Sequence, residues 1–234
     1  MKKFFPSVVF VLSMLCFFVY APAIEARAPH PGFVYVTDVV PNVILEIRYY
    51  STYNFTADRV DGYTAPTAIL SEEAAAALKK VSDAMREQGY VVKIFDAYRP
   101  QAAVDHFVRW AADTADTRLK SVFYPEVDKD QLFALGYIAK KSSHSRGSTV
   151  DLTLVDMQTG RELDMGSPFD FFGPISNHGT DLITPGQAAN REILKNAMLE
   201  AGFKLYPKEW WHYTLENEPF PDTYFNFPVA LVSK

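Results

Sequence analysis

The chain has 234 residues, 48% of them hydrophobic and 22% charged, and a formal net charge of −5. This length and composition allow one sizeable core, so we expect a single domain, and the plentiful aromatic residues argue against intrinsic disorder. A mildly acidic chain without a basic stripe is not expected to bind nucleic acid.

The first residues have the pattern of an export signal. Lys2 and Lys3 precede an apolar run at residues 4–20, and the small residues that follow include two Ala-x-Ala sites. This order is typical of a cleavable signal peptide, so residues 1–26 are predicted to be removed and residues 27–234 to form the functional domain in the periplasm. A membrane anchor is the alternative, because the apolar run is near the lower length limit for a span.

The chain contains one cysteine, Cys16, within the predicted signal. The bulky Leu15 before it argues against a lipoprotein signal, in which a small residue is usual. Once the signal has been removed, no disulfide can form within the domain, and no stable membrane association is expected. The sequence does not indicate an oligomeric state.

Short strands and helices alternate irregularly along the rest of the chain. In chain order we expect strands at 33–36 and 43–49, a helix at 72–88, a strand at 90–95, helices at 100–112 and 128–139, a strand at 149–155, a helix at 187–201 and a last strand region from 203. The helix at 72–88 has the clearest ends, with Ser71 as its N-cap and Gly89 as its stop. Because no regular β-α-β alternation appears, the predicted fold class is α+β, with a small, mainly antiparallel sheet flanked by helices.

Two short stretches contain residues suited to metal chemistry. His144 lies in the Ser/Gly-rich stretch SSHSRGSTVD, which ends with Asp151, and His212 ends the stretch EWWH. Two imidazoles and one carboxylate can hold zinc in three positions and leave a fourth for water. Asp151 opens an apolar run, where a carboxylate needs a partner, so the predicted zinc site lies at the sheet. Glu209, three residues before His212, is placed to act as a general base.

Each of these signals also has a plain structural explanation. A histidine near a glycine is usually a hydrogen-bonded or surface residue, and an aspartate at the start of a strand usually caps a turn. The stretch EWWH could be an aromatic core strand with polar ends. The joint pattern, rather than any one residue, therefore carries the metal-site prediction.

The joint pattern resembles one family of enzymes, through the spacing Ser142-x-His144-x2-Gly147-x3-Asp151 and Glu209-x2-His212. The chain is similar to the D-alanyl-D-alanine dipeptidases, above all the VanX-type enzymes of glycopeptide-resistant bacteria, within a wider group of zinc D,D-carboxypeptidases and cell-wall endopeptidases. The similarity covers residues 33–228 and includes the stretches DAYRPQAAVDHF, SSHSRGSTVDLTL, DMGSPFDFFGP and EWWHYTL. Thr149 stands where the group often has alanine, which leaves the three ligands untouched.

The resemblance implies a set of site residues. One zinc ion per chain would be held by His144, Asp151 and His212. Glu209 would be the catalytic base, and Arg99 would stabilise the oxyanion that develops on the scissile carbonyl. An alternative for Arg99 is a structural ion pair with Asp96 or another carboxylate.

The resemblance also implies residues that bind substrate. Asp170 would pair with the free ammonium of a dipeptide, whereas Tyr49 and Ser142 are candidates for holding its two ends. For Tyr49 and Ser142, packing or turn capping explains the residues equally well. The remaining histidines, His30, His106 and His178, fit the pattern less well.

The resemblance implies hydrolysis of D-Ala-D-Ala to two D-alanines in the periplasm, within the turnover of cell-wall peptides. The alternative is a zinc D,D-carboxypeptidase or endopeptidase acting on peptidoglycan stem peptides, which needs an open cleft; the long segment 101–141 favours a covered site. A catalytically silent wall-binding module is a further alternative, against which Glu209 argues. Export argues against a direct role in glycopeptide resistance. The roles that remain are recycling of the dipeptide and its use as a nutrient.

Overall fold

The structure is a computed structural model, which describes Met1 and residues 28–232. The predicted export signal, including Cys16, lies almost wholly outside these residues, so its fate stays a prediction. Among the residues described, no helix has the length and apolar character needed to cross a membrane.

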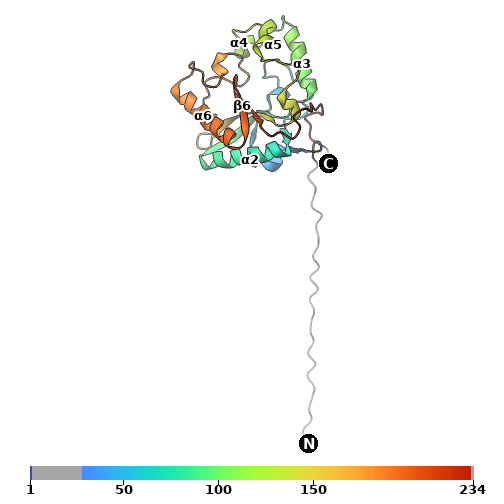
Figure 1. The fold of residues 1–234 in the computed structure, drawn as a ribbon, viewed down its shortest axis with the longest axis vertical. Helices are drawn as coiled ribbons and strands as arrows, with labels where there is room; N and C mark the ends of the chain where they lie inside the picture. Colours follow the sequence, from blue (N-terminus) through green and yellow to red (C-terminus); the bar gives the residue numbers. More distant parts are fainter. Residues whose placement is uncertain (2–27, 233–234) are drawn as a thin grey trace.

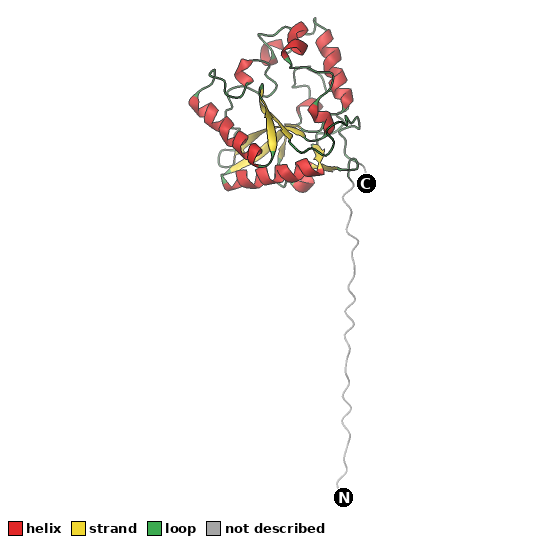
Figure 2. Cartoon of the chain, viewed as in Figure 1, coloured by secondary structure: helices red, strands yellow, loops and turns green. Residues whose placement is uncertain are grey.

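A five-stranded sheet lies at the centre of the molecule (Figure 2). Its order is β2 (Ile44–Leu45), β4 (Tyr90–Asp96), β5 (Thr149–Asp156), β7 (Glu209–Leu215) and β6 (Phe203–Tyr206). Only the pairing of β2 with β4 is parallel, and all other neighbours are antiparallel. The predicted class, α+β with a mainly antiparallel sheet, is confirmed.

Helices lie on both sides of this sheet (Figure 1). On one side α2 (Glu72–Glu87) packs on β4, and α6 (Pro185–Glu200) packs on β6 and on α2. On the side away from α2, three helices lie together: α3 (Gln101–Ala112), α4 (Lys120–Phe123) and α5 (Leu132–Leu135).

Shorter elements complete the fold. A separate antiparallel pair joins β1 (Phe33–Tyr35) to β3 (Ile69–Ser71). The remaining helical pieces are α1 (Val36–Val39) and four 3₁₀ turns, which are η1 (Arg48–Tyr50), η2 (Lys129–Gln131), η3 (Ser143–Arg146) and η4 (Pro174–Ser176).

The two long helices follow from local sequence signals. The Ser71 hydroxyl accepts a hydrogen bond from the backbone N–H of Ala74 and so caps α2, as predicted. Helix α6 begins two residues before the predicted start at 187, because Thr184 and Gln187 form a reciprocal capping box and Pro185 fits the first turn.

Two predicted elements are shorter than expected. The strand predicted at 43–49 ends at Leu45, and the chain turns into η1, which buries Tyr49. The helix predicted at 128–139 is reduced to η2 and the four residues of α5. Gly136 ends α5 in the left-handed conformation, with φ 80°, which favours glycine.

A C-terminal strap, residues 218–229, runs back across the molecule after β7. Its aromatic side chains pack on Phe33 and Tyr98, and the pairs are Phe220–Phe33, Phe225–Phe33, Phe227–Phe33 and Phe227–Tyr98. Glu218 accepts two hydrogen bonds from Arg146, at 2.8 and 2.7 Å. The backbone N–H of Phe225 donates to the Ser145 carbonyl at 2.8 Å. The strap therefore holds η3 in place.

Candidate metal centre and active site

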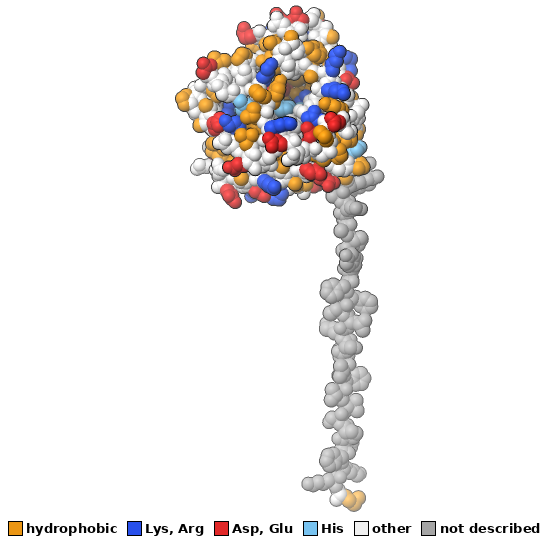
Figure 3. Space-filling view, viewed as in Figure 1, with side chains coloured by type: hydrophobic (Ala, Val, Ile, Leu, Met, Phe, Trp, Pro, Cys, Tyr) orange, Lys and Arg blue, Asp and Glu red, His pale blue; other side chains and the backbone are white. Residues whose placement is uncertain are grey.

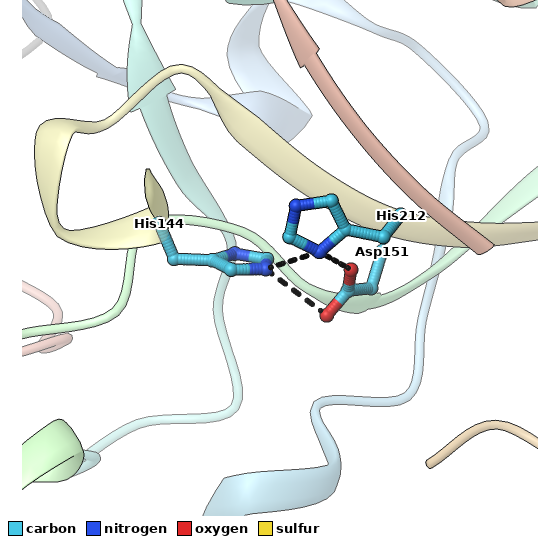
Figure 4. A group of neighbouring side chains, drawn as sticks. All are labelled: His144, Asp151 and His212. Carbon is cyan, nitrogen blue, oxygen red and sulfur yellow. Dashed lines mark hydrogen bonds and ion pairs between the residues drawn. The ribbon is translucent and has the colours of Figure 1, made fainter. Parts of the chain in front are cut away.

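Three side chains from neighbouring elements point toward one another at the sheet (Figure 4). Asp151 on β5 and His212 on β7 are directly paired across the two strands, and η3 brings His144 beside them. His144 Nε2 and His212 Nδ1 lie 3.3 Å apart. Each of the two nitrogens lies 3.2 Å from an oxygen of Asp151. The structure thus brings together the three predicted metal ligands.

This triangle fits a small tetrahedral cation. At metal–ligand distances of about 2.0–2.1 Å, tetrahedral ligand atoms lie about 3.3–3.4 Å apart, close to the 3.3 Å between the two histidine nitrogens. The 3.2 Å contacts run to different carboxylate oxygens, Oδ2 for His144 and Oδ1 for His212, so Asp151 presents one oxygen to each imidazole. Oδ1 of Asp151 is buried and accepts no hydrogen bond among the residues described. A buried carboxylate oxygen without a donor is costly, and a cation between the three groups would satisfy it.

The other nitrogen of each histidine has a partner of its own. His144 Nδ1 lies 2.7 Å from the Ala97 carbonyl oxygen, so an Nδ1–H donates to it. His212 Nε2 lies 3.3 Å from the Ser143 hydroxyl oxygen, to which an Nε2–H can donate. The Ala97 carbonyl, which can only accept, assigns the His144 tautomer whose Nε2 lone pair faces Asp151, and the Ser143 hydroxyl is compatible with the corresponding His212 tautomer.

Burial and mutual charge shift the ionisation of these groups. Burial raises the pKa of Asp151, but the two histidines outweigh it and hold the pKa well below its ordinary value. Burial lowers the pKa of His144, which favours the neutral imidazole that metals require. For His212 burial acts the same way, yet the adjacent Asp151 carboxylate raises its pKa overall, so protons and a metal compete for Nδ1.

Glu209 lies at the start of β7, beside the triangle. Its Oε2 atom is 3.4 Å from His212 Nδ1, and the side chain lines the same cavity as the two histidines. Burial raises the pKa of Glu209 to about 7, against the lowering effect of His212. A carboxyl group with a pKa near neutrality can accept and return a proton at physiological pH.

Arg99 follows β4 and faces the triangle from another side. Its Nε–H donates to Asp96 at 2.9 Å, and Nη2 lies 3.5 Å from Asp151. The guanidinium is stacked on the rings of Tyr49 and Phe107, 4.9 and 5.1 Å from their centroids. The ion pair with Asp96, which was the structural alternative, is therefore present, and Arg99 also lines the cavity.

The three candidates for substrate binding lie in different settings. The Tyr49 hydroxyl, on η1, donates to the Asp170 carboxylate at 3.0 and 3.2 Å. Tyr49 lines the cavity, whereas Asp170 is not among its lining residues. Burial raises the pKa of Asp170 well above its ordinary value. Ser142 lines the cavity, and its hydroxyl also caps η3 by accepting the His144 N–H at 3.3 Å, so the turn-capping alternative is present.

These polar groups surround one small cavity of about 200 Å³. Figure 3 shows the corresponding face of the molecule, which is hollowed near its middle with histidine atoms beside the hollow. Most of the rest of the wall is apolar or aromatic and includes Phe55, Val104, Phe107, Ile138, Phe172, Tyr137 and Tyr206. These wall residues were not predicted individually, because an aromatic side chain at a cavity has the same sequence signal as one in the core.

The remaining histidines lie away from the cavity wall. His106 pairs with Asp61, and His30 is stacked on Phe227. His178 packs against Tyr213, with ring centroids 5.9 Å apart. Of the residues described, only the predicted set therefore forms a compact cluster of potential metal ligands.

The site consists of two histidines and one aspartate with a glutamate beside them, and it lines a cavity in an α+β domain. This combination is typical of the metallopeptidases. Comparison with protein families is consistent with this class. The chain belongs to the D-Ala-D-Ala dipeptidase family of M15 peptidases, whose model matches residues 30–230. The resemblance seen in the sequence motifs is confirmed.

Individual relatives cover almost the same span. The chain is 41% identical over 198 residues to the D-alanyl-D-alanine dipeptidase of Enterococcus faecium, which covers 85% of this chain and 98% of the relative. Identity to the enzyme of the same name from Streptomyces coelicolor is also 41%, with the same coverage. Identity to that of Escherichia coli is 30% over 177 residues, 76% of this chain and 81% of the relative.

Proposed function

We propose that this protein is a zinc-dependent dipeptidase that hydrolyses D-alanyl-D-alanine to two molecules of D-alanine. The observation that carries the proposal is the cluster of His144, Asp151 and His212 beside Glu209, in which the two histidine nitrogens lie 3.3 Å apart and each lies 3.2 Å from a different Asp151 oxygen. Nitrogen and carboxylate donors in a three-ligand set are typical of catalytic zinc. The printed activity of the relatives supports the choice of substrate.

Zinc in this triangle would polarise the scissile carbonyl and lower the pKa of a bound water to about 7. Glu209 would accept a proton from the attacking water and return it to the leaving amine, two steps suited to its raised pKa. Arg99 would stabilise the negative charge that develops on the carbonyl oxygen. Its hydrogen bond to Asp96 and its stacking on Tyr49 hold the guanidinium in one orientation before substrate arrives.

We assign the free ammonium of the dipeptide to the Tyr49–Asp170 pair. Asp170 is only 5% exposed and, within residues 28–232, forms no ion pair with a lysine or arginine. A substrate ammonium would supply the missing positive charge and would favour the ionised carboxylate. Ser142 is the candidate donor for the other end of the substrate.

We further propose that the enzyme acts in the periplasm, in the turnover of cell-wall peptides. The support is the sequence pattern of residues 1–26, with its basic start, apolar run and Ala-x-Ala exits. In that compartment the substrate would be dipeptide released from the wall, for recycling or nutrition.

The test is an assay of the zinc-loaded protein on free D-Ala-D-Ala, beside a pentapeptide ending in D-Ala-D-Ala. We expect efficient cleavage of the free dipeptide and at least about 10²-fold lower kcat/KM on the pentapeptide, which has no ammonium at the scissile unit. Preference for the pentapeptide would indicate a D,D-carboxypeptidase instead. Absence of hydrolysis of either substrate would refute the proposed function.

A further inference from the structure

One wall of the cavity is formed by a segment that is held to the rest of the protein mainly by side-chain contacts. We call residues 133–141 the flap; it begins within α5 and ends before η3. Five of its residues line the cavity, namely Gly136, Tyr137, Ile138, Ala139 and Lys141. The flap therefore borders the space where the proposed substrate binds.

The flap is held to the rest of the molecule by side chains. Within residues 28–232, its backbone forms no hydrogen bond to the backbone of a segment distant in sequence. Ile138 is buried, and the Tyr137 ring is stacked on Phe172 at 4.9 Å. Gln101 Nε2 donates to the Lys140 carbonyl near the end of the flap, at 3.0 Å. A segment with so few backbone bonds belongs to the less stable parts of a fold.

Two side chains, one from the last residue of β6 and one from the β6–β7 turn, contact the other end of the flap. The Tyr206 hydroxyl donates to the Gly136 carbonyl at 3.3 Å, and Lys208 Nζ donates to the Leu135 carbonyl. A Cβ atom on Gly136 would lie 3.4 Å from the Tyr206 hydroxyl and 3.5 Å from Lys208 Nζ, which are ordinary van der Waals distances. The preference for glycine at this position therefore comes from its left-handed φ of 80°.

The same turn leads directly into the candidate catalytic strand. Lys208 immediately precedes Glu209, and the Tyr206 ring lies 5.4 Å from the His212 ring. The two hydrogen bonds thus connect the flap to the strand that bears both the candidate base and a metal ligand. When they are formed, the flap and this strand border the cavity on two sides.

We propose that Tyr206 and Lys208 act as a latch that keeps the flap closed, and that this latch limits the length of peptide the cavity accepts. The limit on length rests on the proposed dipeptidase function, whereas the latch itself does not. A closed flap leaves a cavity of about 200 Å³, and release of the latch would let that wall move away. Selection by length is then separate from recognition of the ammonium by Asp170.

The first experiment measures the latch without any substrate. Tyr206→Phe, Lys208→Met and the double variant are compared with the parent by amide hydrogen exchange of the zinc-loaded proteins. Tyr206→Phe keeps the ring beside His212 and removes only the hydroxyl. Lys204→Met is the matched control, because Lys204 is exposed on β6 and none of the hydrogen bonds found in residues 28–232 involves its side chain.

We expect the double variant to exchange the flap amides at least about tenfold faster, since each lost hydrogen bond destabilises the closed state. Exchange in α2 should be unchanged in every variant, and Lys204→Met should resemble the parent throughout. Unchanged exchange in the flap of the double variant would overturn the latch. This result does not depend on whether the protein hydrolyses D-Ala-D-Ala.

The second experiment compares the dipeptide with the tripeptide D-Ala-D-Ala-D-Ala. The tripeptide has a free ammonium and a free carboxylate, so it differs from the dipeptide in length alone. We expect the double variant to raise the ratio of kcat/KM for tripeptide over dipeptide at least about tenfold, and Lys204→Met to leave it unchanged. A constant ratio together with faster exchange of the flap would overturn the limit on length. Parent protein inactive on both peptides would instead contradict the proposed function.

Discussion

Three buried carboxyl groups lie close together at the site, and their surroundings give them different proton affinities. Two histidines outweigh the effect of burial and hold the pKa of Asp151 low, burial raises the pKa of Glu209 to about 7, and burial also raises the pKa of Asp170 well above its ordinary value. Groups whose pKa values are pushed apart can perform different tasks. A metal ligand, a general base and a partner for an ammonium are the three tasks that we assign to them.

Glu209 is the residue whose loss should affect catalysis without affecting the metal. We expect Glu209→Gln to retain stoichiometric zinc and to lower kcat by about 10²–10⁴-fold, since the amide cannot accept the proton. Elemental analysis and a D-Ala-D-Ala assay on the same preparation check this. Activity within about threefold of the parent would contradict the assignment.

Metal content tests the ligand triangle directly. We expect His144→Ala and His212→Ala each to lose most of the bound zinc, because two ligands hold the ion much more weakly than three. His106→Ala is the control, since His106 lies away from the cavity and pairs with Asp61. The ligand set is wrong if both site variants purify with one zinc per chain.

Asp170 should govern recognition of the free amino group. We expect the parent to discriminate at least about 10²-fold against N-acetyl-D-Ala-D-Ala, because an unpaired buried charge costs several kcal/mol at about 1.4 kcal/mol per tenfold. Asp170→Asn should raise KM for the free dipeptide and reduce this discrimination, with zinc content unchanged. Asp181→Asn, at an exposed position, should behave as the parent. Equal rates of the parent on both dipeptides would rule out the assignment.

At the scale of elements, α6 positions the loop that carries Asp170. Arg191 is buried, and its guanidinium donates to the carbonyls of Met165, Ile175 and Asn177 at 2.6, 2.9 and 3.0 Å. Burial lowers the pKa of Arg191 to about 10, so it stays charged at neutral pH. One side chain thus ties both ends of the segment 165–177 to the helix.

Removal of the Arg191 hydrogen bonds should destabilise the protein. We expect Arg191→Met to lower the free energy of unfolding by about 2–4 kcal/mol, because three buried carbonyl groups lose a charged donor. Urea unfolding of zinc-loaded protein measures this. Lys195→Met, at a partly exposed position of the same helix where the lysine pairs with the exposed Glu192, should change stability by less than about 0.5 kcal/mol. Similar losses in both variants would show that the tie has no special role.

The sequence alone was sufficient to predict those elements whose formation depends on local signals. The capped helix α2 and the apolar strand β5 depend on neighbouring residues, and both could be predicted. The metal motif joins His144 and Asp151 to the distant His212, and its prediction rested on the joint pattern and on the resemblance to a known family. The early end of β2 could not be predicted, because it depends on the burial of Tyr49. The end of α5 at Gly136 has a local signal, the glycine itself, which the predicted helix at 128–139 passed over. The bond between Tyr49 and Asp170 likewise joins residues 121 positions apart, which no local pattern predicts.

At the scale of the whole molecule, the position of the mature N-terminus tests the proposed compartment. The Ala-x-Ala sites predict cleavage that leaves an N-terminus between Ala23 and Pro29. The N-terminus can be measured by expressing the full chain in a bacterium with a periplasm, fractionating the cells and sequencing the protein from its N-terminus. Replacing Lys2 and Lys3 with glutamate should reduce export. An intact Met1 on membrane-bound protein would favour the anchor instead.

The strap has a consequence for when activity appears during biosynthesis. His144, Ser145 and Arg146 are synthesised long before Glu218 and Phe225, the residues that hold their turn. A nascent chain, or one still threaded through a translocation pore, has its first two metal ligands but not the finished site. The site can therefore be completed only after the chain has been released as far as Phe225, and an exported chain would complete its site beyond the membrane.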